Sequence, residues 1–502
     1  MTAVTATTSD AFRPAMHYAA RSTWLNDPNG LIFHDGLYHL YYQNNPLGSV
    51  WGNMSWGHAT SADLLTWSEH PVAIACDEVE DVFSGSIVFD RHNTSGFGSA
   101  SRAPLVAVYT SAYKPESEHH GVQAQSLAYS LDGGYTWAKY SGNPVLNRGS
   151  SDFRDPKVFR YESDTGSYWV MVAVEAQDFE VVFYKSHDLQ SWELLSSFGP
   201  ANATGGVWEC PDLFPLPVDG DPENLKWVLT INLSPGGPNG GSAGQYFVGD
   251  FDGVTFTSAS TVTDGLQNPD RLGEYQWLDW GRDYYAAVSF NDVPDGRRLM
   301  IGWMNNWQYA NSIPTSPWRS PMSLVREVSL QSVDGSWRLV QQPARELASL
   351  PAGNPPFTAG AGEISEGTHL LDGAAGSVQR IEAGFTPGTA EEFGLIVRGN
   401  GTHGTRIGVR PSEGRLIVDR RYSGQTDFHE SFASIDAAPI EPAGNSYQLT
   451  IYVDHCSVEA FAQGGQVTLS ELIFPASTSR DVSLYAVGGT ATINNLHITR
   501  WA

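Results

Sequence analysis

Cysteine is scarce in this 502-residue chain, and the metal-binding motifs that depend on cysteine or histidine spacing do not occur. The three cysteines, Cys76, Cys210 and Cys456, are widely spaced and form no CxxC pair, so neither a disulfide framework nor a zinc site is indicated. Among the 14 histidines there is no HExxH arrangement. We therefore expect neither a metal ion nor another cofactor.

Positive charge is also in short supply. Lys and Arg number 29 against 55 Asp and Glu, which gives a formal net charge of −26. Binding to nucleic acid or to an anionic membrane surface requires clustered cationic side chains, so we expect neither partner. The composition favours a neutral ligand and gives no reason to expect an assembly larger than a monomer.

Long apolar runs are missing, since nowhere do about eighteen apolar residues follow one another, as a membrane-spanning helix would need. The first ten residues lack the basic start and the apolar run of a signal peptide. We expect an extracellular protein whose signal has been removed, while a cytoplasmic location is also consistent with this start.

Glycine, proline and aromatic residues are abundant, with 51 Gly, 29 Pro, 16 Trp, 21 Tyr and 22 Phe. Aromatic side chains suit pleated sheets, and Gly and Pro mark the turns between short strands. The chain is longer than one hydrophobic core usually serves. These features predict an all-β protein with two domains.

A short phrase recurs in the first half of the chain and predicts a β-propeller. It occurs as SADLLTW at 61–67, SLDGGYTW at 130–137, SHDLQSW at 186–192 and, more loosely, DFDGVTF at 250–256. Each copy is typical of a turn leading into a strand whose aromatic residue packs between neighbouring sheets. Alternating apolar segments at 36–42, 105–109, 168–174, 227–231 and 284–289 predict five strands and hence five blades.

The second half of the chain predicts a β-sandwich. Segments 393–398, 447–453 and 457–461 alternate as strands with one solvated face do. We expect an N-terminal tail over residues 1–13, a propeller over 14–343, a Pro- and Gly-rich linker over 344–367, and a C-terminal sandwich over 368–502.

Three acidic motifs each precede a predicted strand. Asp27 lies in WLNDPNG at 24–30, Asp155 in FRDP at 153–156, and Glu209 in WECPD at 208–212. Taken singly, they could be turn or loop residues. Each precedes one copy of the repeated phrase, however, so we predict equivalent places on inner strands, with the three carboxylates meeting at the propeller axis. Carboxylates gathered without a metal suggest glycoside chemistry.

At this point the chain resembles glycoside hydrolase family 32, which includes invertases, exo-inulinases and levanases. The matching motifs run in order along nearly the whole chain: NDPNG at 26–30, YYQNNP at 41–46, WGH at 56–58, FSGS at 83–86, RDP at 154–156, EC at 209–210 and VDHCSVEAF at 453–461. The resemblance implies a five-bladed propeller followed by a β-sandwich, in agreement with the repeats. Segment 231–253 is similar to the exo-inulinase, levanase and yeast-invertase branch, which implies release of terminal fructose.

The resemblance also implies the roles of individual residues in a retaining β-fructofuranosidase. Asp27 would be the nucleophile, Glu209 the acid and base, and Asp155 the stabiliser of the transition state, with Arg154 orienting Asp155. We expect Trp208 and Cys210 to desolvate Glu209. Asn26, Gln43, Trp51, Phe83, Ser84, Arg154 and Trp303 are the candidates for binding the sugar, from sucrose, a fructo-oligosaccharide or a fructan.

Several alternatives stay open at the level of sequence. A dedicated fructosyltransferase would share the covalent intermediate and resolve it with a sugar hydroxyl. An arabinan- or xylan-cleaving propeller would use two Asp and one Glu with inversion, which NDPNG and the Glu209-Cys210 pair argue against. A non-catalytic sugar-binding propeller would not need three intact carboxylates. Cys210 itself could be a nucleophile, although no Ser/Cys, His and Asp pattern surrounds it.

Overall fold

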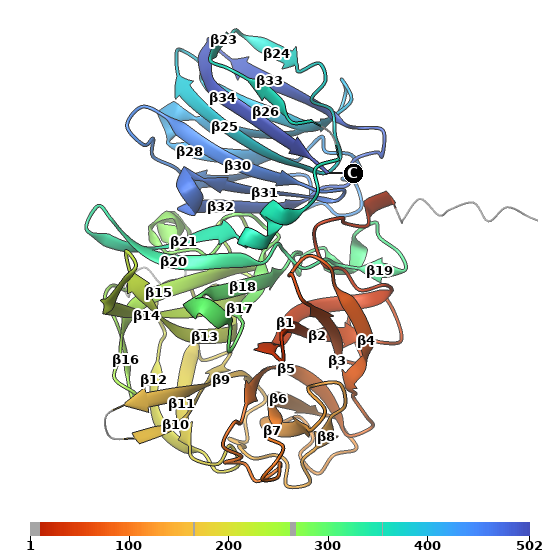
Figure 1. Cartoon of the computed structure of the whole chain (residues 1–502), viewed down its shortest axis with the longest axis vertical. Coiled ribbons are helices and arrows are strands. Elements are labelled where there is room, and N and C mark those ends of the chain that lie inside the picture. The colour runs from red at the N-terminus through yellow and green to blue at the C-terminus, as the bar shows by residue number, and fades with distance from the viewer. Residues whose placement is uncertain (1–10, 164–165, 262–267, 354, 502) are drawn as a thin grey trace, which may run out of the picture.

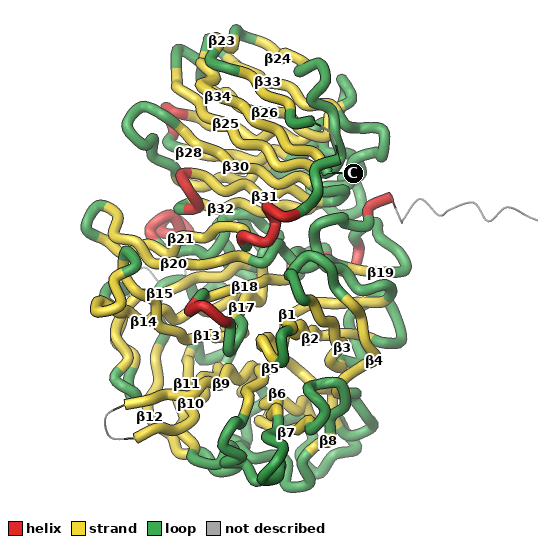
Figure 2. The backbone as a smooth tube through the Cα atoms, in the orientation of Figure 1, coloured by secondary structure: helices red, strands yellow, loops and turns green. Residues whose placement is uncertain are grey.

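The computed structural model describes residues 11–163, 166–261, 268–353 and 355–501, and these residues build two β domains stacked along the long axis of the molecule (Figure 1). Strands dominate both domains, and the helices are single short turns (Figure 2). The predicted all-β class is therefore confirmed. Within the described part, no helix is long and apolar enough to cross a membrane. Residues 1–10 of the predicted tail lie outside the described residues.

The N-terminal domain is a propeller of five four-stranded antiparallel sheets. The innermost strands, β1, β5, β9, β13 and β17, contact one another in a closed ring. In chain order the sheets are β1 (Thr23–His34), β2 (Leu37–Asn45), β3 (Ser55–Ser61) and β4 (Ser68–Ile74); β5 (Glu80–Phe89), β6 (Leu105–Tyr113), β7 (Gln123–Ser130) and β8 (Ala138–Lys139); β9 (Phe153–Ser163), β10 (Gly166–Glu175), β11 (Glu180–Ser186) and β12 (Glu193–Phe198); β13 (Val207–Val218), β14 (Asp221–Ser234), β15 (Ala243–Phe251) and β16 (Phe256–Ser258); and β17 (Tyr285–Ser289), β18 (Arg298–Trp303), β20 (Arg326–Val333) and β21 (Ser336–Pro343).

Five blades were predicted and five are present, but the five predicted segments do not all hold the same place in a blade. The first four fall in β2, β6, β10 and β14, which are the second strands from the axis, whereas 284–289 is the innermost strand β17. The ring closes where the main chain of Asn291, after β17, exchanges hydrogen bonds of 2.9 Å with Leu31 and Phe33 of β1. A two-residue strand, β19 (Trp318–Arg319), extends the first blade on the other side of β1.

The repeated phrase forms the turn between the third and fourth strands of a blade. In the second blade, the Asp132 carboxylate accepts hydrogen bonds from the amides of Tyr135 and Thr136 at 3.1 and 2.9 Å. The indole of Trp137 donates to the Gly134 carbonyl at 2.9 Å. Asp63, Asp188 and Asp252 accept the same pair of backbone amides in the other three copies. The phrase thus encodes an aspartate-stabilised turn, as predicted.

A β-bulge interrupts each of the five innermost strands near its N-terminal end. Two residues of the inner strand stand opposite one residue of the second strand, between positions 25 and 28, 82 and 85, 154 and 157, 209 and 212, and 285 and 288. In the last three blades the first bulge residue has a left-handed backbone, with φ of 63° at Asp155, 46° at Cys210 and 53° at Ala286. Such bulges redirect side chains, and here they do so five times around one axis.

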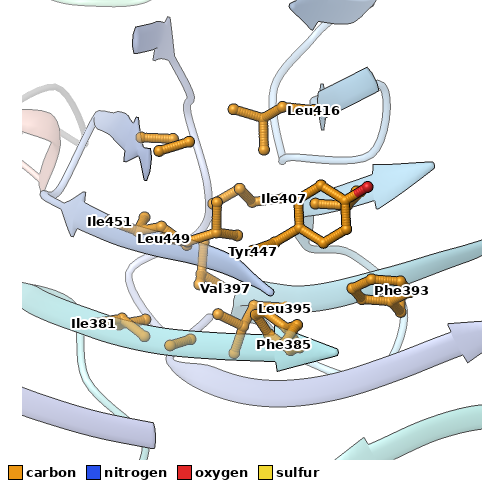
Figure 3. Packing of buried hydrophobic residues seen from close by; sticks show 14 of the residues in the cluster. Ile381, Phe385, Phe393, Leu395, Val397, Ile407, Leu416, Tyr447, Leu449 and Ile451 are labelled. Atoms are coloured by element: carbon orange, nitrogen blue, oxygen red, sulfur yellow. The ribbon is translucent and has the colours of Figure 1, made fainter. Parts of the chain in front are cut away.

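The C-terminal domain is a sandwich of two antiparallel sheets. One sheet contains β22 (Phe357–Ala359), β23 (Gly362–Ile364), β34 (Ala491–Arg500), β25 (Gln379–Pro387), β30 (Tyr447–Val453), β31 (Ser457–Ala462) and β32 (Val467–Leu472). The other contains β24 (Gly367–Leu370), β33 (Asp481–Val487), β26 (Glu392–Gly399), β27 (Thr405–Arg410), β28 (Arg415–Asp419) and β29 (Ile435–Pro439). Their inner faces pack apolar side chains such as Phe385, Leu395 and Ile451 against one another (Figure 3).

The expected linker differs from the structure in its second half. Residues 357–359 and 362–364, which we placed in the linker, pair with β34 and already belong to the sandwich. Pro and Gly there mark turns between short edge strands, which composition alone does not separate from a linker. Within 344–367, residue 354 lies outside the described residues. The remaining helical turns are η2 (Pro269–Glu274), η3 (Pro294–Gly296), η4 (Ala310–Ser312), η5 (Arg345–Ser349), η6 (Pro411–Glu413) and η7 (Gln463–Gly465).

Buried ion pairs join the two domains. Arg326 of β20 binds Asp279 of the propeller at 2.9 Å and Glu459 of the sandwich at 2.7 Å. Arg420 of the sandwich binds Asp283 of the propeller at 2.6 Å. All five side chains are fully buried. Because a buried charge is costly unless it is paired and hydrogen-bonded, these contacts fix how the domains dock.

Candidate active site

Asp27, Asp155 and Glu209 come together at one mouth of the propeller axis, on the innermost strands of the first, third and fourth blades. Their places on these strands are neighbouring and not identical, which corrects our expectation of equivalent positions. Glu209 is the last residue before the bulge, Asp155 is the first bulge residue, and Asp27 is the second. The repeated phrase locates the inner strand correctly, but a bulge gives consecutive residues different directions and can be recognised only in the strand register.

Asp27 is held by three hydrogen bonds that favour its ionised form. Its carboxylate accepts from the Ser84 hydroxyl at 2.8 Å, from the Asn26 side-chain amide at 2.9 Å and from the Cys210 thiol at 3.6 Å. Burial and the negative charge of Glu209 together raise the pKa of Asp27 to about 6, against the three hydrogen bonds, which lower it. Asp27 therefore titrates near neutrality and is ionised above that range.

Asp155 is the most enclosed of the three acids, with a side chain only 6% exposed. Its carboxylate accepts from the Cys210 amide at 2.9 Å, and its own amide donates to the Thr110 hydroxyl at 3.0 Å. Burial raises the pKa of Asp155 to about 7, against the opposing charge of Arg154. Glu209 and Asp27 add to the rise because their charges are of the same sign.

Glu209 is partly accessible, with 23% of its side chain exposed. Its two carboxylate oxygens have different partners. Oε1 accepts from Arg154 Nη2 at 3.2 Å, while Oε2 accepts a very short hydrogen bond from the Tyr285 hydroxyl. Arg154 and Tyr285 occupy the same pre-bulge position as Glu209 in the neighbouring blades, so three equivalent residues are linked side by side.

Two expectations about the neighbours of these acids need correction. Arg154 does not serve Asp155 alone, because its shortest carboxylate contact is with Glu209, and Asp155 lies 3.9 Å from its Nε. Trp208 is fully buried and donates to the Ala203 carbonyl at 2.9 Å, inside the apolar core between the third and fourth blades. An alternating strand points consecutive side chains to opposite faces, so Trp208 and Glu209 face different ways.

Cys210 is a bridge between the two aspartates. Its thiol lies 3.6 Å from Asp27 Oδ2 and 3.7 Å from Asp155 Oδ2. Burial raises the pKa of this thiol well above its usual value, and the three surrounding carboxylates raise it further. A thiol that stays protonated is a poor nucleophile, which argues against the Cys210 alternative and makes it a weak hydrogen-bond donor to both aspartates.

Apart from Arg154, the predicted sugar-binding residues are of two kinds: polar residues that lie beside Asp27 or the second bulge, and aromatic residues that pack against other rings. Asn26 and Ser84 touch Asp27 directly, and the Gln43 amide donates to the Val82 carbonyl at 3.0 Å, beside the second bulge. Trp51, 46% exposed, lies edge-on to Phe83 with ring centres 6.2 Å apart. Trp303 is fully buried and packs on Trp24 at 5.9 Å, and its indole NH has no partner among the described residues.

Sequence reasoning missed Tyr285 and Thr110, which contact Glu209 and the backbone of Asp155. The signal for Tyr285 was available, because the segment 284–289 was predicted as a strand and Tyr285 is its second residue. The sequence did not indicate, however, that this segment is an innermost strand. Thr110 lies on a second strand, β6, and no pattern distinguishes it from other strand threonines.

The arrangement can perform acid–base chemistry next to a second carboxylate. It combines a partly exposed glutamate, an aspartate that accepts three hydrogen bonds and a third, enclosed acid, all at the mouth of a propeller. This combination defines a glycoside-cleaving enzyme, since such enzymes require one carboxyl group to protonate the leaving oxygen and another to meet the sugar carbon.

Comparison with known proteins identifies the family. Residues 17–343 match the glycosyl hydrolases family 32 N-terminal domain, and residues 352–500 match the glycosyl hydrolases family 32 C-terminal domain. The chain belongs to glycosyl hydrolases family 32 and is a glycoside hydrolase. The sequence-based identification of the family is thus confirmed, together with the propeller and sandwich that it implied.

Relatives are similar over almost the whole chain. A levanase of Bacillus subtilis (strain 168) is 44% identical over 495 residues, covering 97% of this chain and 70% of the relative. An extracellular exo-inulinase of Aspergillus niger is 41% identical over 505 residues, covering 95% and 92%. The crystal structure of the exo-inulinase from Aspergillus awamori superposes with a TM-score of 0.91 at 39% identity, covering 98% of both chains.

Proposed function

We propose that the protein is a retaining β-fructofuranosidase that releases terminal fructose from fructans and sucrose. The levanase and exo-inulinase relatives support this substrate class. The observation that carries the proposal is the contrast between two acids at one mouth. Asp27 receives hydrogen bonds that favour its anion, whereas Glu209 is held at both oxygens by Arg154 and Tyr285.

In this reaction, Asp27 attacks the anomeric carbon of fructose while Glu209 protonates the departing glycosidic oxygen. The bond to the leaving sugar breaks as a covalent fructosyl ester of Asp27 forms. Glu209, now ionised, removes a proton from water, which attacks the same carbon and frees Asp27. Two displacements on one carbon restore the original configuration, and Glu209 returns to its protonated form.

Asp155 and Arg154 assist this sequence without exchanging protons. Asp155 is fixed by the Cys210 amide and accepts hydrogen bonds from hydroxyl groups of the fructose ring. These bonds position the ring while its geometry changes. The Arg154 guanidinium stays protonated and holds Glu209 in place. Asn26, Gln43, Trp51, Phe83, Ser84 and Trp303 stay our predicted sugar-binding residues.

The proposal is tested with Asp27→Asn and Glu209→Gln, which keep the shape of each side chain and remove its acid. We expect each change to lower kcat by at least about 10²–10⁴-fold on sucrose, inulin and levan, because general acid–base assistance alone has that magnitude. The exposed acid Asp250, changed to Asn, is the control and should retain normal turnover. Near-normal activity in either of the first two variants would refute the assignment.

The stereochemistry, the exo action and the choice of water as acceptor are tested by identifying the products. Nuclear magnetic resonance should show β-fructofuranose as the first anomer released; initial release of the α anomer would establish inversion. Time courses on inulin and levan should show fructose alone from the start, as exo action requires. If kestose-type oligosaccharides predominate over free fructose at moderate sucrose concentration, the protein is a fructosyltransferase.

The location and the oligomeric state of the protein are also part of this proposal. The name of the extracellular exo-inulinase supports our expectation that the protein acts outside the cell. The expected monomer is tested by sedimentation or light scattering of the full chain.

A further inference from the structure

The propeller axis has a second mouth, at the C-terminal ends of the innermost strands, and a cavity of about 450 Å³ opens there. It is lined by residues of the second, third, fourth and fifth blades, while the catalytic carboxylates lie at the N-terminal ends of the same strands. We call this cavity the distal chamber and define it by Arg91, Lys157, Arg160, Arg298, Trp169 and Trp227.

Positive charge is concentrated in the distal chamber although the whole chain carries −26. Four cationic side chains line it, against the carboxylates of Glu162 and Asp292. Lys157 is neutralised by the buried Asp212 at 3.2 Å. No carboxylate of a described residue lies within 4.0 Å of the other three cations, the guanidinium groups of Arg91, Arg160 and Arg298.

Each of these three arginines is nevertheless fixed in place. The guanidinium carbon of Arg160 lies 5.0 Å from the centre of the Trp169 ring, and its Nη2 donates to the Ser167 hydroxyl at 2.6 Å. Arg298 lies over Phe214 at 4.9 Å, and Arg91 over Phe89 at 5.2 Å. Stacking on an aromatic ring orients a guanidinium without using its N–H donors.

Donors in this chamber remain unused. Arg160 Nη1 is buried and has no hydrogen-bond partner in the described structure. Arg298 donates only to the Ser289 hydroxyl and the Phe290 carbonyl, both at the long distance of 3.3 Å. Burial lowers the pKa of Arg298, against the charges of Asp212 and Asp292, neither of which lies within 4.0 Å of its guanidinium group. A buried donor without an acceptor is costly, so the chamber is arranged for an acceptor that carries negative charge.

We propose that the distal chamber binds a small tetrahedral oxyanion, either inorganic phosphate or the phosphate group of a small metabolite. Guanidinium groups match such anions in both charge and fork geometry. The overall charge of −26 repels long polyanions, and the chamber volume limits the ligand to a small molecule. The aromatic rings of Trp169 and Trp227 can pack against the body of a phosphorylated metabolite.

The test is a calorimetric titration of the full chain with sodium phosphate, compared with sodium chloride at matched ionic strength. We expect saturable binding of phosphate and none of chloride. Arg160→Gln should weaken phosphate binding about tenfold or more, since a charge-assisted hydrogen bond is lost. Arg91→Gln, at an exposed position, should weaken it as well and covers the case in which Arg160→Gln does not fold.

Arg102→Gln is the matched control, because it removes the same charge from an exposed residue outside the chamber. Its phosphate affinity should equal that of the parent. Glucose 6-phosphate separates the two sources of the anion: tighter binding than inorganic phosphate assigns the chamber to a phosphorylated metabolite, and equal or weaker binding assigns it to free phosphate. Heats that match those of chloride, or variants indistinguishable from Arg102→Gln, would overturn the proposal.

Discussion

In the proposed reaction Asp27 must be ionised to attack, yet burial beside Glu209 raises its pKa to about 6. The hydrogen bonds from Ser84, Asn26 and Cys210 limit this rise. An acid poised in this way is reactive near neutrality and becomes protonated in moderately acidic solution. The lower limit of the pH range for activity should therefore be governed by the partners of Asp27.

Changing Ser84 to Ala should move that limit upward. The Ser84 hydroxyl stabilises the ionised Asp27, so its loss raises the pKa of Asp27 and protonates the nucleophile at a higher pH. We expect the acidic limb of kcat/KM to shift upward by about one pH unit, which corresponds to one charge-assisted hydrogen bond. Ser197→Ala, at an exposed site on the outermost strand β12 of the third blade, should leave the limb in place. A limb that moves downward in Ser84→Ala would contradict this account.

Changing Tyr285 to Phe should affect the positioning of Glu209 without affecting the binding of the sugar. The Tyr285 hydroxyl donates to Glu209 Oε2, so its loss frees one side of the carboxyl group. We expect kcat on sucrose to fall by about 10²-fold, the cost of a misplaced catalytic group, with KM nearly unchanged. On an aryl fructoside, whose leaving group needs little protonation, the loss should be much smaller. Equal losses on both substrates would show that Tyr285 does not act through Glu209.

The sequence could predict which acids meet but not how they are held. NDPNG, RDP and the Glu209-Cys210 pair identify the three carboxylates because their chemistry is local to short motifs. The link from Arg154 to Glu209 and the two contacts of Cys210 arise between blades. Contacts of that kind depend on strand register, which a single sequence does not display.

At the scale of elements, the repeated phrase shows what a sequence can specify well. Its aspartate and its aromatic residue both make their hydrogen bonds within one turn, so the pattern and the structure coincide. The bulges of the innermost strands show the opposite case. Their residue pairs are Asn-Asp, Phe-Ser, Asp-Pro, Cys-Pro and Ala-Ala, which share no common side chain, and only the pairing with the second strand makes them equivalent.

Changing Asp132 to Ala should destabilise the propeller through this turn. The Asp132 carboxylate accepts two backbone amides and the hydroxyl groups of Ser130 and Thr136. We expect a loss of about 1–2 kcal/mol in the free energy of unfolding, measured by denaturant titration. Asp132→Asn retains an acceptor oxygen and should recover about half of the loss. If the two variants are equally stable, the turn does not depend on the acceptor.

At the scale of the whole molecule, the N-terminal segment is fastened to the sandwich by buried charges. His17 contacts Asp454 at 2.7 Å and Glu459 at 2.9 Å, and the amides of Ala15 and Met16 also donate to Asp454. Burial acts to lower the pKa of His17, but the hydrogen bonds and charges of both acids raise it to about 9. Asp454 and Glu459 belong to the VDHCSVEAF motif, whose role is thereby structural.

Thermal stability should reflect this histidine. Because its folded pKa exceeds the ordinary value of 6.5, its contribution is complete below about pH 6.5 and disappears as pH rises through about 9. His17→Ala leaves the buried Asp454 without a cationic partner, while Glu459 retains Arg326, and should cost about 3–5 kcal/mol near neutrality. His403→Ala, at an exposed position, is the control. A melting temperature of His17→Ala equal to that of the parent at pH 6.5 would contradict this role.

The contacts of Ala15, Met16 and His17 with the sandwich also bear on recombination between relatives. These residues lead directly into β1, the strand at which the ring of blades closes, yet their partners belong to a domain encoded more than 400 positions later. A chimera that joins this propeller to the sandwich of a relative would lose these contacts unless that sandwich supplies acids equivalent to Asp454 and Glu459. The two domains are therefore expected to have been inherited together, because any single crossover between His17 and Asp454 separates these residues from their partners.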